Sequence, residues 1–272
     1  TFIETAHAKN VANFEQWTSF IAGLGAPYNP SKASLKLTAM KTLLANSKTM
    51  VGAVNASLPA NKNAISAREA AFKPLNTLIA RVSNAVNAID VSEQVNESVK
   101  SLTRKIQGRR ATAKKTDEEL KALAAEGKAT KNVSSSQMSY DSRLDSFDKL
   151  IKQLASIKEY APNEPELKIA SLTTLYNDLN AKNSAVVTSQ VTLSNARIAR
   201  NDVMYKPNTG LVDVALDSKS YIKSAFGPTS PQYKQISKLE FKSIPNWYIV
   251  RSFVDTPVET HGRASLQFFI MC

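Results

Sequence analysis

The sequence is poor in the residues that build metal and nucleotide sites. Its 272 residues include one cysteine, two histidines and eight glycines. A structural zinc site usually takes four Cys or His ligands, yet His7 and His261 lie near opposite ends and Cys272 is the last residue. The single G-x-G run, Gly23-Leu24-Gly25, lacks a third glycine and follows no strand-like segment. We therefore expect no metal, no cofactor and no disulfide framework.

Nothing in the sequence anchors an enzymatic activity. No Ser or Cys lies in a recognisable nucleophile motif such as G-x-S-x-G, and we expect both histidines at the surface. Two groups of carboxylates have structural explanations. Glu159, Glu164 and Glu166 surround a proline turn, where helix capping explains them. Asp141, Asp145 and Asp148 are explained as a solvated helix face. The sequence predicts a protein that is not an enzyme.

The chain also lacks a long hydrophobic run. No stretch approaches about 18 uninterrupted apolar residues, and the first residues do not form a basic segment followed by an apolar one. We expect a cytoplasmic protein without stable membrane insertion. Because the chain begins at Thr1 rather than at methionine, removal of an upstream signal is an alternative.

The residues that are abundant are typical of packed helices. Hydrophobic residues make up 43% of the chain and aromatic residues 7%, so Ala, Leu, Val and Ile supply most of the apolar content. With so little glycine, this mixture predicts an all-α fold.

An internal repeat is the most informative feature of the sequence. Residues 28–54 align without a gap on residues 160–186, and eight of the 27 columns are identical, where chance gives about two. The identical pairs are Tyr28/Tyr160, Pro30/Pro162, Leu35/Leu167, Lys36/Lys168, Thr42/Thr174, Leu43/Leu175, Ala53/Ala185 and Val54/Val186. The alternative is that Ala- and Leu-rich helices resemble one another by composition alone.

Each copy is predicted to be a set of helices cut by proline. Apolar spacing indicates short helices over 9–23 and 139–158. Long helices should follow N-caps at Ser31 and Asn163, and Pro59 should break the first of them. Further breaks and helix starts are predicted at Lys73-Pro74, Lys206-Pro207, Ser92 and Ser230-Pro231.

These elements predict an elongated antiparallel bundle of two helical-hairpin units. The repeat units cover about 14–102 and 147–239, and a basic connector at 103–146 joins them. Residues 1–13 are too few to judge. Residues 240–272 are aromatic and β-branched, which fits either a hairpin or a non-native extension that packs poorly on the bundle.

Positive charge is concentrated in the connector. The chain carries 35 Lys and Arg against 23 Asp and Glu, a net charge of +12. One stretch has six cations and no acid, which suits either a helix C-terminus ending near Gly108 or contacts with phosphates. No aromatic residue is interleaved for base stacking, so nucleic-acid binding there would be sequence-independent. The six cations are Arg104, Lys105, Arg109, Arg110, Lys114 and Lys115.

Three runs of residues carry a resemblance to a known family. They are Tyr28-Asn29-Pro30-Ser31-Lys32-Ala33-Ser34-Leu35, Arg104-Lys105-Ile106-Gln107-Gly108-Arg109-Arg110-Ala111 and Ser135-Ser136-Gln137-Met138-Ser139-Tyr140-Asp141-Ser142-Arg143-Leu144. Over about residues 9–243 the chain resembles an uncharacterised family of helical bacterial proteins. The resemblance implies no activity and no site, and it leaves both flanks outside the familiar region.

The leading functional prediction is a non-enzymatic structural or interaction protein that presents long helical faces to a protein partner. The first alternative is sequence-independent nucleic-acid binding through the basic connector. The second is reversible membrane association by amphipathic helices, although the many Ala and Ser residues in the helical stripes fit helix packing better than lipid.

Overall fold

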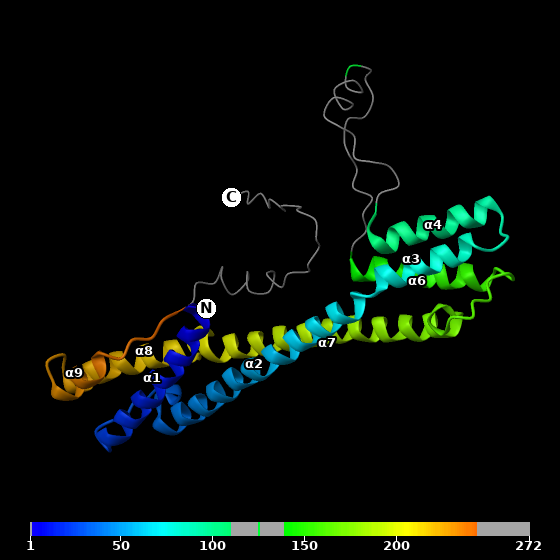
Figure 1. The fold of residues 1–272 in the computed structure, drawn as a ribbon. Coiled ribbons are helices and arrows are strands. Elements are labelled where there is room, and N and C mark those ends of the chain that lie inside the picture. Colours follow the sequence, from blue (N-terminus) through cyan, green and yellow to red (C-terminus); the bar gives the residue numbers. More distant parts are fainter. Residues whose placement is uncertain (1, 110–124, 126–138, 244–272) are drawn as a thin grey trace. The chain divides into compact units, whose positions relative to one another are not determined.

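The computed structural model describes residues 2–109, 125 and 139–243, and every element within them is a helix (Figure 1). The predicted all-α fold is confirmed for this part of the chain. In order, the elements are α1 (Phe2–Leu24), the 3-10 turn η1 (Ala33–Leu35), α2 (Leu37–Phe72), α3 (Leu75–Asn87), α4 (Glu93–Gln107), α6 (Tyr140–Ala155), the 3-10 turn η2 (Pro165–Leu167), α7 (Ile169–Tyr205), α8 (Leu211–Phe226) and α9 (Pro231–Ser237).

The described chain divides into two compact units. Unit 1 takes residues 2–63 and 188–243, and unit 2 takes residues 64–109 and 139–187. Each unit therefore contains part of both long helices, α2 and α7. The compact units do not coincide with the predicted repeat segments. The second part of α2 belongs to unit 2, which contains α6, and the second part of α7 belongs to unit 1, which contains α1.

Unit 1 has its core where α1 and α8 meet. Phe14, Trp17 and Ile222 are buried there, and α9 packs against both helices. Phe241 makes edge-to-face contacts with the rings of Phe14 and Trp17, at centroid distances of 6.2 and 5.8 Å. Of the two alternatives for the tail, poor packing does not describe Phe241, which joins this core. Residues 244–272 lie outside the described residues.

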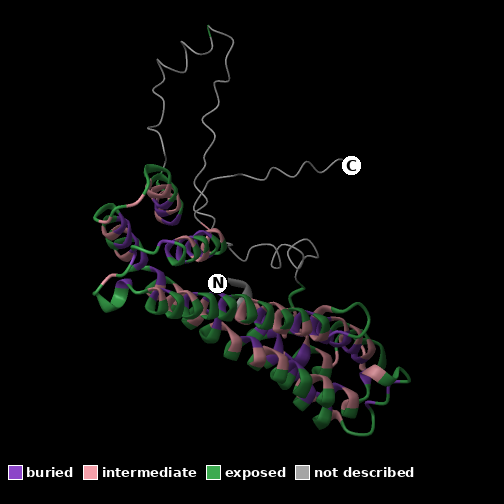
Figure 2. Cartoon of the chain, turned by 90° about the vertical axis from the view of Figure 1, so that its right-hand side faces the viewer, coloured by how far each residue is buried: buried purple, intermediate pink, exposed green. Residues whose placement is uncertain are grey.

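Unit 2 has its core between α3, α4 and α6. Buried side chains from these three helices include Ile79, Val99 and Phe147, and α4 packs closely on both neighbours. Figure 2 shows buried faces turned inward and exposed faces outward on the helices of each unit. Burial of these apolar faces is the main stabilising contribution to each unit.

Burial follows the same register in corresponding helices. In α1 and α6 the buried positions include 10, 11, 14, 17, 18, 21 and 143, 144, 147, 150, 151, 154, whereas His7 and Ser146 are buried without a buried counterpart. In α3 and α8 they include 75, 79, 82, 86 and 211, 215, 218, 222. In α2 and α7 they include 40, 47, 54, 61 and 172, 179, 186, 193. Four of the buried positions in each long helix recur every seven residues, a spacing close to two helical turns. The internal repeat itself stays a prediction.

The two corners before the long helices have the same geometry. The hydroxyl of Tyr28 donates to the carbonyl of Leu35 at 2.8 Å, and the hydroxyl of Tyr160 donates to the carbonyl of Leu167 at 2.8 Å. A 3-10 turn then leads into each long helix, at Leu37 and Ile169. The predicted side-chain caps are wrong, because the 3-10 turns begin after Lys32 and Glu164 without a side-chain cap and the tyrosines hold the corners instead.

Proline has different effects at different places in the chain. Pro59 lies inside α2, so the predicted break is wrong there. Pro74 follows the end of α2 at Phe72, and Pro207 follows the end of α7 at Tyr205, as predicted. Pro59 is exposed, and the helix is held on either side by the buried residues Val54 and Asn61. Tertiary packing therefore outweighs the roughly 3 kcal/mol by which an interior proline disfavours a helix.

A buried chain of hydrogen bonds supports the Tyr28 corner. The indole Nε1 of Trp17 donates to Ser218 Oγ at 3.1 Å, and Ser218 and Tyr28 share a hydrogen bond of 3.0 Å. Because the Tyr28 hydroxyl donates to Leu35, Ser218 donates to Tyr28, and each buried polar group has a partner. The matching positions in unit 2 are Leu150 and Val82, which are apolar. Unit 2 thus has a tyrosine corner without the serine link.

This difference predicts a pH dependence at Tyr160. Burial raises the pKa of both tyrosines, that of Tyr160 to about 12, whereas the hydrogen bond with Ser218 opposes the rise at Tyr28. Between pH 10 and 12 the unfolded chain loses the Tyr160 proton and the folded chain keeps it, so stability falls as pH rises, by no more than about 2–3 kcal/mol. Denaturant unfolding from pH 9 to 11 should show a shallower fall in Tyr160→Phe, and equal slopes would contradict the assignment.

Candidate functional site

The predicted basic cluster lies at the C-terminal end of α4. Arg104 and Lys105 belong to the last turn of this helix, and Arg109 follows it on the surface. The other three predicted residues, Arg110, Lys114 and Lys115, lie outside the described residues. The structure therefore places half of the cluster at one helix end, where positive charge interacts favourably with the helix dipole.

Gly108 ends α4 as predicted. It has a left-handed backbone (φ 67°), and its N–H donates to the carbonyl of Lys105 at 3.2 Å, while the N–H of Arg109 donates to the carbonyl of Arg104 at 2.8 Å. This pair of bonds is a Schellman motif, which satisfies the last carbonyls of the helix. At the other end, Ser92 caps the helix by accepting from the N–H of Val95. The basic residues are thus held on a helix whose two ends are both fixed.

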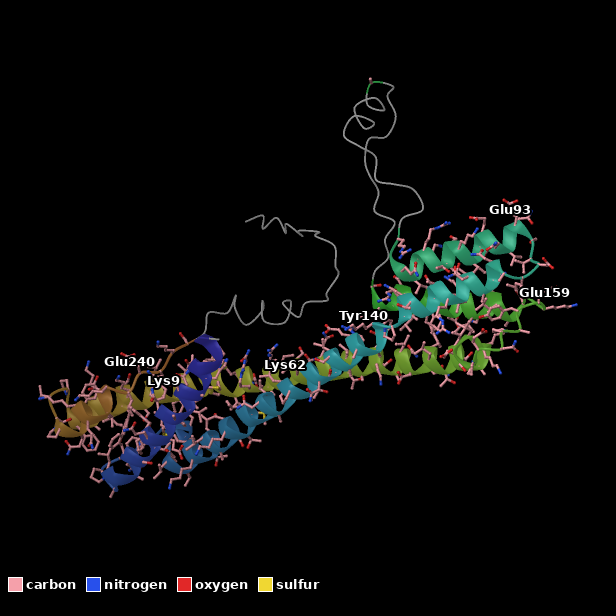
Figure 3. All side chains as sticks on the ribbon, in the orientation of Figure 1. Lys9, Lys62, Glu93, Tyr140, Glu159 and Glu240 are labelled. Atoms are coloured by element: carbon pink, nitrogen blue, oxygen red, sulfur yellow. The ribbon has the colours of Figure 1, made fainter. Side chains whose placement is uncertain are left out.

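Lys105 faces an open groove of about 550 Å³ between α4 and α6. The two helices are antiparallel: Glu93 at the start of α4 and Tyr140 at the start of α6 lie at opposite ends of the pair (Figure 3). Residues spaced three and four apart on each helix line the groove, so each helix contributes one face. The lining residues are Ser98, Ser101, Leu102, Lys105, Lys149, Lys152, Gln153 and Ser156. The groove contains three lysines and no acid.

Sequence reasoning missed two of these lysines. Lys149 and Lys152 follow the predicted cluster by about 40 residues, and only the packing of α4 on α6 brings them near Lys105. Their ammonium groups pair with Asp145 and Asp148, each at 2.6 Å. The hydrogen bond to Asp148 raises the pKa of Lys152. These exposed pairs are weak, so an anionic ligand could compete for both lysines.

The residues that the sequence suggested as weak catalytic or metal candidates have structural contacts. Asp141 accepts a hydrogen bond from Asn183 at 2.7 Å. His7 is buried, and its Nδ1 lies 2.7 Å from the Tyr205 hydroxyl, so its predicted surface position is wrong. The sequence could not show that α1 brings His7 against the end of α7. His261 lies outside the described residues, and within them no cluster of His, Cys, Asp or Glu is arranged to hold a metal ion.

A second surface feature lies on α7. Val187, Val191 and Ile198 are 55%, 54% and 48% exposed, and their spacing of four and seven residues places them on one side of the helix. We call these three residues the α7 stripe. Exposed apolar side chains are common when scattered, whereas these three are aligned along one helix. The sequence alone could not distinguish them from the buried positions Val186 and Leu193 beside them.

Comparison with known proteins assigns no function to the groove or to the α7 stripe. A comparison with family models, with curated proteins and with solved structures finds no match to this chain. In the part of the chain that the structure describes, none of the helices is long and apolar enough to cross a membrane.

Proposed function

We propose that this protein is a non-enzymatic helical protein that binds a protein partner through the α7 stripe. The observation that carries the proposal is the alignment of Val187, Val191 and Ile198 on the exposed side of a 37-residue helix. An α-helix of this length is about 55 Å long. Such a helix offers a partner a continuous surface on which apolar residues recur at helical spacing.

The residues that the predicted repeat aligns with the stripe support this proposal. The positions of α2 that align with Val187, Val191 and Ile198 are Asn55, Pro59 and Ser66. These three residues are also exposed, yet none is an aliphatic residue of the Val, Ile or Leu type. Apolar residues at these positions of α7 therefore contribute little to folding and are better explained by an interaction.

The surroundings of the stripe indicate the chemistry of the partner. Residues 183–196 contain no charged residue, although charged residues make up 21% of the chain. The exposed neighbours Thr188, Thr192 and Asn195 are polar and neutral. A partner helix with an apolar seam and uncharged flanks would bury Val187 and Val191 without desolvating an unpaired charge, while Ile198 lies next to Arg197.

A matched pair of variants tests this proposal. Val187→Asp together with Val191→Asp should weaken partner capture from nuclease-treated native extract at least about tenfold, because a carboxylate is costly to bury in an apolar contact. Asn55→Asp together with Pro59→Asp places the same two charges on the aligned positions of α2 and should leave capture unchanged. Both proteins should keep wild-type helical circular dichroism. Equal capture by wild type and the double variant would overturn the proposal.

Nucleic-acid binding is a second candidate, favoured by the groove between α4 and α6. Replacing Lys105, Lys149 and Lys152 with Gln should lower the slope of log affinity against log salt by about two to three on duplex DNA. The control replaces three other exposed lysines, Lys41, Lys48 and Lys62. A slope that changes equally in both triple variants would exclude the groove, and absence of DNA retention in the wild type would exclude this function. Liposome flotation of the same proteins tests the membrane alternative.

A further inference from the structure

Arg143 is a buried cation whose charge is not needed for the hydrogen bonds it makes. The side chain is 8% exposed. Its Nε donates to the carbonyl of Ile106 at 3.0 Å, and Nη2 donates to Oδ1 of Asn76 at 2.9 Å. No carboxylate among the described residues forms an ion pair with it. Burial lowers the pKa of the guanidinium, as expected for a charge without a counter-ion.

The equivalent position in unit 1 shows which part of this arrangement is structural. Asn10 matches Arg143 in burial register, and its Nδ2 donates to the carbonyl of Lys242 at 2.8 Å. Both side chains therefore hold a backbone carbonyl: Arg143 that of Ile106 near the end of α4, and Asn10 that of Lys242 after α9. Because the neutral Asn10 performs this role, the positive charge of Arg143 exceeds the structural requirement.

The charge lies beside an open pocket of about 530 Å³ on unit 2. Arg143 and Lys73 contribute cations to its lining, and Asn76 contributes an amide. Glu69 also lines the pocket, which leaves a net charge of +1. This balance suits one singly charged anionic group. The remaining lining residues are Ser66, Ala70, Phe72 and Tyr140.

Aromatic contacts fix the orientation of the guanidinium. Its central carbon lies 5.2 Å from the centre of the Phe72 ring, and Phe72 packs edge to face on Tyr140 at 4.8 Å. Arg68 stacks on Tyr140, with 3.9 Å between its central carbon and the ring centre. The hydrogen bonds that Arg143 makes within the described residues come from Nε and Nη2, and none comes from Nη1. The free edge formed by Nη1 and the remaining proton of Nη2 matches the two oxygens of a planar oxyanion.

We propose that this pocket binds an oxyanion, a carboxylate or phosphate group of a small ligand, with Arg143 as the bidentate donor and Lys73 as the second cation. The proposal is independent of the α7 stripe. Binding gives the buried charge the counter-ion that the described residues do not provide, and Asn76 stays in place as the orienting acceptor.

Thermal unfolding of the full chain in sodium acetate, sodium phosphate and sodium chloride at equal ionic strength tests this site. An anion present at ten times its Kd should raise the melting temperature by about 3–5 °C over chloride. A shift with acetate alone identifies a carboxylate ligand, a shift with phosphate alone identifies a phosphoryl ligand, and a shift with both identifies a general oxyanion site. Absence of any shift relative to chloride overturns the proposal.

Variants then locate the effect. Arg143→Gln should abolish the shift, and Arg143→Lys should reduce it because a lysine cannot bind both oxygens in one plane. Lys73→Gln, at an exposed position, should weaken anion binding about two- to fivefold without unfolding the protein. If the Arg143 variants do not fold, the result for Lys73→Gln tests the site. Lys62→Gln is the matched control. An unchanged shift in Lys73→Gln and in a folded Arg143→Gln would overturn the site.

Discussion

Replacing Trp17 with alanine should lower the free energy of unfolding by about 3–5 kcal/mol. The indole is fully buried between α1 and α8, so its removal leaves a large cavity in the core of unit 1. The change also removes the donor to Ser218, which is itself fully buried. Urea or guanidinium unfolding followed by circular dichroism measures the loss.

Trp17→Phe separates the two contributions. Phenylalanine keeps most of the apolar volume but cannot donate to Ser218 Oγ, so the loss should shrink to about 1–3 kcal/mol. The combination with Ser218→Ala should cost less than the sum of the two single changes, because both remove the same hydrogen bond, while Ser218→Ala alone also removes the donor to Tyr28. Full additivity of the two changes would show that the bond contributes nothing.

Replacing Gly210 with alanine should destabilise the protein by about 2–3 kcal/mol. A Cβ atom at this position would lie 2.6 Å from the backbone nitrogen and 2.8 Å from the carbonyl oxygen of Lys206. Both atoms belong to the turn between α7 and α8, where the N–H of Gly210 donates to Lys206 at 2.7 Å. A rigid backbone cannot move aside as a flexible side chain would, so the turn must open.

Gly52→Ala is the control for this substitution. Gly52 lies in the middle of α2, and a Cβ atom there would meet no other atom within 4 Å. At an exposed interior position of a helix, alanine has a higher helix propensity than glycine. This change should therefore stabilise the protein by about 0.5–1 kcal/mol. The two substitutions are chemically identical, and shifts of the same sign in thermal unfolding would contradict the local geometry.

Local signals in the sequence predicted several helix ends correctly. Ser92 and Ser230 cap α4 and α9, Gly108 ends α4, and the breaks before Pro74 and Pro207 occur as expected. Each depends on the conformational preference or hydrogen bonding of a few adjacent residues. Such preferences depend on a short stretch of sequence, so they can be predicted without knowledge of the tertiary fold.

Features that depend on distant contacts could not be predicted in the same way. Pro59 is tolerated because α2 is held by packing on either side, and His7 is buried by a tyrosine 198 residues away. The groove at Lys105 exists because α6 returns along α4. Likewise, the spacing of Val187, Val191 and Ile198 fits both a buried and an exposed stripe, and only the folded helix shows which residues face outward.

Photo-crosslinking along the exposed sides of α7 and α2 tests the proposed function most directly. A photoreactive phenylalanine analogue is placed in turn at positions 187, 191 and 198 of α7, and at the aligned positions 55, 59 and 66 of α2. The account predicts one protein adduct, in nuclease-treated extract, from the three α7 positions and none from α2. Adducts of equal yield from both helices, or from neither, would contradict it.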